Sequence, residues 1–129
     1  MPSRNELHKY QQRMINFIYT TPKCALWAGL GLGKTITTLT AIVDLIDSMV
    51  VSKVLIVAPL RVANSVWHVE AARWQHTKHL KFSIVTGSEK ERLAALHKTA
   101  DVYVINRENV TWIVEHYAKK WPFDMIVLD

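Results

Sequence analysis

Residues 28–35 read AGLGLGKT, with three glycines at alternate positions followed by a lysine and a threonine. A short apolar run, CALWA at 24–28, precedes this stretch, and apolar residues at helical spacing follow it. Glycines permit the dihedral angles and the close approach with which main-chain N–H groups surround a phosphate. In such a loop Lys34 reaches the β- and γ-phosphates, and the Thr35 hydroxyl coordinates Mg²⁺. The stretch therefore predicts a nucleotide-binding phosphate loop in preference to a plain glycine-rich turn.

Strand-like and helix-like segments alternate along the rest of the chain. The five expected strands are 24–28, 54–58, 82–86, 102–105 and 125–129. The expected helices, marked by apolar residues at helical spacing, are 7–18, 36–50, 62–74, 93–96 and 110–117. Continuous apolar strands that alternate with helices are typical of a parallel sheet with helices on both faces. The predicted fold class is therefore α/β.

Composition and charge narrow the class of protein. The chain has 129 residues, of which 50% are hydrophobic and 21% charged, as expected for one compact domain. Its net charge of +5 favours a polyanionic partner such as nucleic acid, without deciding it. Cys24 is the only cysteine, which excludes an internal disulfide and fits a reducing compartment. Because no apolar leader or membrane-length run is present, we expect a cytoplasmic protein with no membrane segment.

Five stretches resemble, in the right order, motifs of the Swi/Snf-like helicases of superfamily two, most closely those carried by bacteriophages. The loop at 28–35 resembles motif I, although it begins with alanine where the usual phosphate loop has glycine. LHKYQ at 7–11 is similar to the element that precedes motif I, and VLIVAPLRVANSVWHVEAARW at 54–74 resembles motif Ia and its following helix. VYVINRENV at 102–110 is similar to motif Ib, and FDMIVLD at 123–129 resembles the strand that leads into the D-E box.

This resemblance implies a P-loop NTPase with a RecA-like parallel sheet, of which 1–129 is the N-terminal part. Asp129 is then the first residue of the D-E box and holds Mg²⁺ through water, as an acid at the end of a central strand can. The catalytic glutamate, motif III and the second RecA-like lobe are expected outside these residues. The implied activity is ATP-dependent movement on DNA, in a bacterial or phage-infected cell.

The expected nucleotide site combines the phosphate loop with two residues before it. Its members are Tyr10, Gln11, Ala28, Gly29, Leu30, Gly31, Leu32, Gly33, Lys34 and Thr35. Gln11 has an amide that both donates and accepts, which suits the adenine edge, and Tyr10 can pack on the base. Spacing alone favours a solvated Gln11 equally, and the resemblance favours binding. The expected catalytic residues are Lys34 and Asp129, and the expected Mg²⁺ ligands are Thr35 and Asp129.

Several polar residues come just after strand ends, where open α/β sheets bind ligands. They are Arg61, Thr86, Ser88, Asn106 and Arg107. Each alone is more typical of a solvated loop. Together they predict a groove that contacts the DNA backbone without reading base sequence.

Two further pairs of residues have competing interpretations. Trp67 and Trp74 lie seven apart, and core packing is favoured for both over stacking on bases. His76 and His79 are close enough for a metal pair, but a solvated loop is favoured because further ligands are lacking nearby.

The resemblance also predicts the order of strands in the sheet. The family places a later strand between the phosphate-loop strand and the D-E strand. We therefore expect the order 24–28, a vacancy, 125–129, 54–58, 102–105 and 82–86, or direct pairing of 24–28 with 125–129.

Two other functions remain open at this level. The chain alone could be a nucleotide- or DNA-binding module that does not hydrolyse ATP. A small P-loop kinase has less support, because an arginine-rich lid is not visible and the motif Ia stretch would be unexplained.

Overall fold

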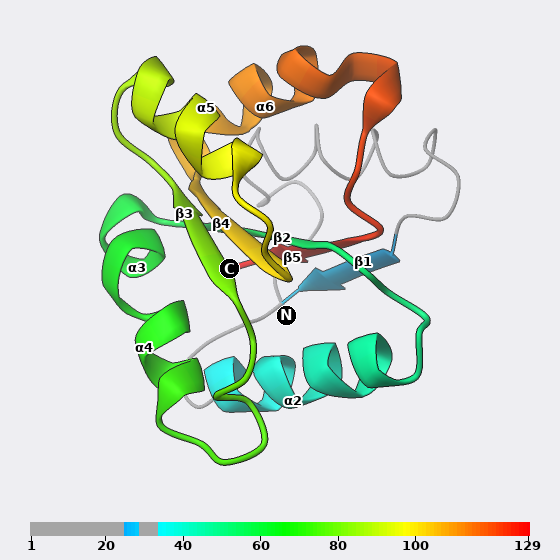
Figure 1. Cartoon of the computed structure of the whole chain (residues 1–129). Helices are drawn as coiled ribbons and strands as arrows, with labels where there is room; N and C mark the ends of the chain where they lie inside the picture. The colour runs from blue at the N-terminus through cyan, green and yellow to red at the C-terminus, as the bar shows by residue number, and fades with distance from the viewer. Residues whose placement is uncertain (1–24, 29–33) are drawn as a thin grey trace, which may run out of the picture.

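The computed structural model describes residues 25–28 and 34–129, and Figure 1 shows their arrangement. Its five strands are β1 (Ala25–Ala28), β2 (Val54–Ala58), β3 (Phe82–Val85), β4 (Val102–Asn106) and β5 (Met125–Leu128). Its helices are α2 (Lys34–Asp47), α3 (Leu60–Ser65), α4 (Trp67–Ala72), α5 (Glu89–His97) and α6 (Val110–Tyr117). Short 3₁₀ turns at Arg107–Asn109 and Ala118–Lys120 flank α6. The expected helix at 7–18 lies outside the described residues.

All neighbouring strands pair in parallel, in the order β1-β5-β2-β4-β3. The α/β class and the order of the last four strands are confirmed. Of the two predicted arrangements, the vacancy is wrong and direct pairing is confirmed, because β1 pairs with β5, with Ala28 opposite Leu128. Direct pairing gives hydrogen-bond partners to main-chain groups that a vacancy would leave unpaired on both strands.

The central strands β2, β4 and β5 are buried along their whole length. Their continuous apolar sequences are explained by helices on both faces of the sheet. β3 lies at the edge and alternates between partly buried and buried residues. This alternation matches an edge strand with one better-covered face.

Two hydrophobic cores lie on opposite faces of the sheet. Helices α2, α3 and α4 cover one face, and α5 and α6 cover the other (Figure 1). Alternate residues of one strand serve the two cores, since Val54 and Ile56 join the first while Leu55 and Val57 join the second. At about 25 cal/mol per Å² of buried apolar surface, these cores provide the main stabilisation of the fold.

The predicted helix at 62–74 is present as α3 and α4, with an irregular residue between them. Val66 has a φ of −107°, and the Ser65 hydroxyl donates to the Arg61 carbonyl at 2.7 Å, a bond that bends helices. The buried residues of these helices are Ala63, Trp67 and Ala71.

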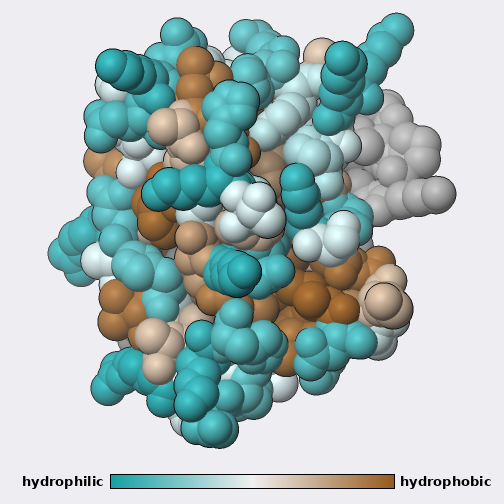
Figure 2. All heavy atoms as spheres, viewed as in Figure 1, coloured by the Kyte–Doolittle hydropathy of each residue, from teal (hydrophilic) through white to brown (hydrophobic). Residues whose placement is uncertain are grey.

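The predicted apolar face of this helix is wrong in part. Val69 is 48% exposed and Trp74 is 44% exposed, so the expected core packing of Trp74 is wrong and that of Trp67 is confirmed. Small alanines let these helices approach the sheet beside the buried Trp67, while Val69 and Trp74 remain exposed. Figure 2 shows hydrophobic residues as several separate areas among hydrophilic ones on one face of the molecule.

Candidate functional site

The candidate site lies at the carboxyl edge, which is the edge of the sheet where the parallel strands end. Ala28 is paired with Leu128, so Asp129 follows at the edge where the chain leaves β1. The chain enters α2 at Lys34, and Thr35 is the second residue of that helix. β2 lies on the other side of β5, with Val57 opposite Leu128. The topology therefore brings Asp129 close to the carboxyl end of β1, although the two are far apart in sequence.

Hydrogen bonds to separate parts of the fold hold Asp129. Its main-chain N–H donates to the Val57 carbonyl at 2.8 Å, which extends the pairing of β5 with β2. Its carboxylate Oδ2 accepts the indole N–H of Trp67 at 3.1 Å. Its main-chain oxygen accepts from the Arg107 guanidinium at 2.6 Å. Asp129 is partly buried, and these bonds hold both its main chain and its side chain in a defined position.

The other expected nucleotide ligands are only partly described. Ala28 is the last residue of β1, and Lys34 is the first residue of α2. The side chain of Thr35 is partly buried. The remaining members, Tyr10, Gln11 and the loop residues 29–33, lie outside the described residues. A helix that begins at Lys34 directs main-chain N–H groups and the positive end of its dipole toward this edge.

The five expected DNA contacts differ in how they are used within the fold. Arg61 is exposed on α3, whereas Arg107 donates to Asp129. Thr86 donates to the Asn64 amide oxygen at 2.8 Å. Asn106 is buried; its amide donates to Glu108 at 2.9 Å and accepts from Asn109 at 2.7 Å.

Ser88 is the N-cap of α5. Its hydroxyl accepts from the Glu91 main-chain N–H at 3.2 Å, and the Glu91 carboxylate accepts from the Ser88 N–H at 3.0 Å. This reciprocal pair is a capping box, which satisfies two donors at the start of a helix. The main-chain and hydroxyl hydrogen bonds from Ser88 hold the pKa of Glu91 below its ordinary value.

Sequence reasoning missed a group of contacts that joins α5 to α6. We call it the α5–α6 cluster, and its members are Glu89, Arg92, Trp112 and His116. The Trp112 indole donates to Glu89 at 2.9 Å, and the Arg92 guanidinium lies 4.5 Å from the Trp112 ring centre. The His116 ring stacks on Trp112 with 5.3 Å between centroids. The four residues come from two helices, so no single sequence window could reveal them.

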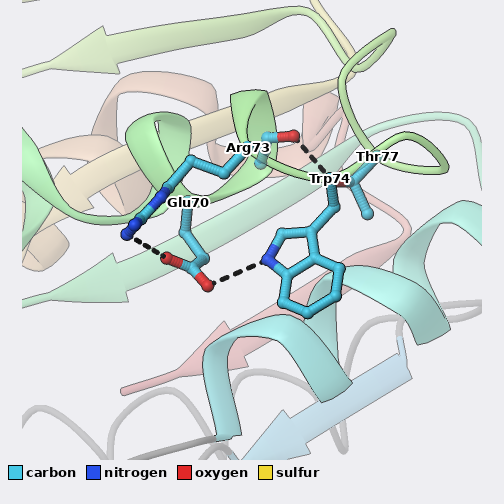
Figure 3. Close-up of polar contacts among 5 residues, drawn as sticks. Glu70, Arg73, Trp74 and Thr77 are labelled. Atoms are coloured by element: carbon cyan, nitrogen blue, oxygen red, sulfur yellow. Dashed lines mark hydrogen bonds and ion pairs between the residues drawn. The ribbon is translucent and has the colours of Figure 1, made fainter.

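A depression at the C-terminal end of α4 is lined by Glu70, Arg73 and Trp74, whose side chains are drawn in Figure 3. The Glu70 carboxylate accepts from the Trp74 indole at 3.0 Å and lies 3.7 Å from the Arg73 guanidinium. Thr77 closes the end of α4 with a hydrogen bond of 2.7 Å to the Ala71 carbonyl. None of the expected site residues that the structure describes lines this depression.

The two histidines after α4 are both exposed. His76 Nε2 lies 2.8 Å from the Thr40 hydroxyl on α2. That hydroxyl itself donates to the Ile36 carbonyl, so the histidine nitrogen is the donor to Thr40. His76 therefore connects the end of α4 to the helix that follows the phosphate loop.

No helix in the described part of the chain is long and apolar enough to span a membrane.

Comparison with known proteins agrees with this arrangement. The family model of the SNF2-related domain matches residues 10–129. A protein named p41 from Acyrthosiphon pisum secondary endosymbiont phage 1 is 41% identical over 122 residues. That match covers 93% of this chain and 26% of the phage protein, so the chain spans about a quarter of its relative. With a parallel α/β sheet consistent with a RecA-like fold, this chain belongs to the SNF2-related domain family.

Proposed function

We propose that this chain is the ATP-binding part of a DNA translocase that couples ATP hydrolysis to movement on DNA. The observation that carries the proposal is that Asp129 follows β5 at the edge where the paired strand β1 ends. β1 ends at Ala28, opposite Leu128, so the strand before the glycine-rich sequence and the strand before Asp129 end side by side at the carboxyl edge, where open α/β sheets bind ligands. The SNF2-related family supplies the expectation of a helicase-like ATPase module.

The side chains proposed for Mg²⁺ suit its chemistry. Mg²⁺ prefers oxygen ligands, which the Thr35 hydroxyl and the Asp129 carboxylate provide. Asp129 is fixed at its main chain by Val57 and Arg107, so its carboxylate is directed from a rigid strand end. When bound, the ion would neutralise charge on the phosphates.

Each residue of the nucleotide site has a proposed task. Lys34 binds the β- and γ-phosphates, while the main-chain N–H groups of residues 28–33 surround them. Gln11 and Tyr10 recognise the base. Asp129 and Thr35 orient the Mg²⁺-bound phosphates.

DNA is the proposed partner, bound through its backbone. Arg61 is the strongest candidate contact because it is exposed on α3, just after the end of β2. The relative is about four times as long as this chain. We assign hydrolysis, the glutamate of the D-E box and the second RecA-like lobe to a longer protein of this kind.

Calorimetric titration of ATP with Mg²⁺ tests the nucleotide site. Lys34→Ala should weaken binding about 100-fold, because a charge-assisted hydrogen bond to phosphate contributes roughly 1.5–3 kcal/mol. Lys90→Ala is the matched control, since Lys90 is exposed on α5, which covers the opposite face of the sheet from α2. Equal affinity of the wild type and Lys34→Ala would refute the proposed site.

A further inference from the structure

We infer that Trp67 is a positioning residue for the Mg²⁺-binding carboxylate of Asp129. This inference rests on the proposed function and adds a residue from α4 to the nucleotide site. The Trp67 indole N–H lies 3.1 Å from Asp129 Oδ2, across 62 residues of sequence. Trp67 itself would not touch nucleotide or metal, and it would act only through the carboxylate.

Trp67 is suited to this task because it cannot easily move. Its side chain is 2% exposed and belongs to the core cluster that also contains the small residues Ala63 and Ala71. An indole has one donor, and a buried donor needs an acceptor to avoid a cost of about 1–3 kcal/mol. The packing of Trp67 therefore fixes the point in space at which the Asp129 oxygen is held.

The main chain of Asp129 is held independently of its side chain. Val57 accepts its N–H, and Arg107 donates to its main-chain oxygen. These bonds position the main chain. The bond from Trp67 holds one oxygen of the side-chain carboxylate. A carboxylate accepts along roughly four lone-pair directions, so one bond from Trp67 is compatible with a Mg²⁺-bound water on the same group.

Residues that orient a metal ligand typically change metal affinity by about 10–100-fold when they are replaced. Asp129 is proposed to hold Mg²⁺ through water, so we expect the low end of this range. A merely structural tryptophan would behave differently. Its replacement would weaken the fold, and nucleotide affinity would fall equally with and without Mg²⁺.

The test compares Trp67→Phe with Trp112→Phe in the 129-residue chain. Each change removes an indole N–H that donates to a carboxylate. The acceptor is Asp129 for Trp67 and Glu89, in the α5–α6 cluster, for Trp112. Calorimetric ADP titrations are run without Mg²⁺ and over a range of Mg²⁺ concentrations. Trp67→Phe should raise the Mg²⁺ concentration for half-maximal enhancement of binding about tenfold and leave Mg²⁺-free affinity within about twofold. Trp112→Phe should change neither quantity.

An unchanged Mg²⁺ requirement in folded Trp67→Phe would overturn the inference and leave the proposed function standing. Absence of Mg²⁺-dependent ADP binding in the wild type would overturn both. A second measurement uses only wild-type protein, in case Trp67→Phe does not fold. With ADP present, Mg²⁺ should shift the assigned Trp67 indole N–H resonance and leave that of Trp112 in place. If the Trp67 resonance stays in place while Mg²⁺ tightens ADP binding, the inference is wrong.

Discussion

Trp67 and Trp112 make the same hydrogen bond in two different parts of the molecule. Each donates its indole N–H to a carboxylate, at 3.1 Å to Asp129 and at 2.9 Å to Glu89. Trp67, on α4, is almost fully buried, whereas Trp112 is partly exposed and contacts Arg92 and His116. The first joins α4 to the end of β5 at the carboxyl edge, and the second joins the two helices α5 and α6. Burial therefore determines whether such a bond serves the core and the site or only a local contact.

The largest difference should appear when each tryptophan is replaced by alanine. Trp67→Ala should lower the free energy of unfolding by about 3–5 kcal/mol, because it opens a large cavity and removes the donor to Asp129. Trp112→Ala should cost only about 1–2 kcal/mol, mainly through its contacts with Arg92 and Glu89. Urea unfolding followed by circular dichroism measures both values. Similar losses in the two variants would contradict the comparison.

Sequence reasoning identified the strands better than the helix faces. Runs such as VLIVA at 54–58 are apolar throughout, because both faces of the sheet are covered, and no other element explains them as well. The face of α3 and α4 was harder, since Val69 is a better apolar marker than Ala63 or Ala71. Close packing on the sheet requires small residues, which a count of large apolar ones overlooks.

The candidate site was predicted in its residue types but not in its internal contacts. The glycine-rich loop and Asp129 are recognisable because their chemistry depends on local sequence. The bonds from Trp67 and Arg107 to Asp129 depend on the order of strands and on the packing of α4. Arg107 illustrates the limit: its position after a strand end suggested a DNA contact, and the structure shows it bound to Asp129.

Arg107 and Arg92 allow a second comparison between the carboxyl edge and the α5–α6 cluster. Arg107 donates to the main-chain oxygen of Asp129, and Arg92 donates to the Gly87 carbonyl, both at 2.6 Å. Arg107→Ala should cost about 2 kcal/mol of unfolding free energy and should also weaken Mg²⁺-dependent nucleotide binding. Arg92→Ala should reduce stability only. Calorimetric titration beside urea unfolding separates the two, and weaker nucleotide binding in Arg92→Ala would count against the separation.

Arg61 should report on DNA without affecting either tryptophan. It is exposed on α3, so Arg61→Ala should leave stability unchanged and lower DNA affinity by about fivefold, equally for all sequences. The slope of log affinity against log salt should fall by about one. Fluorescence anisotropy with two unrelated duplexes measures both quantities. Loss confined to one duplex would indicate recognition of bases instead.

The capping box beside the α5–α6 cluster should have a smaller effect on stability. Ser88→Ala removes the hydroxyl that accepts from the Glu91 N–H and should cost about 1 kcal/mol. Thr40→Ala is a control that removes a different hydroxyl, the one that contacts His76 on the other side of the sheet. Thermal unfolding compares the midpoints of Ser88→Ala and Thr40→Ala with that of the wild type. An unchanged midpoint in Ser88→Ala would show that the cap adds nothing to the fold.

The smallest effect concerns the pH dependence of that cap. Hydrogen bonds from the Ser88 main chain and hydroxyl lower the pKa of Glu91 below its ordinary value of 4.5. A carboxyl group whose pKa is lower in the folded state stabilises the fold above its unfolded pKa, and this contribution disappears as pH falls through the folded pKa. Glu91→Gln should therefore match the wild type most closely in acid, and the difference should grow toward pH 6. Glu115→Gln, an exposed change on α6, is the control. Urea unfolding from pH 3 to pH 6 measures the difference, and a constant offset between wild type and Glu91→Gln would show that the cap is insensitive to the charge of Glu91.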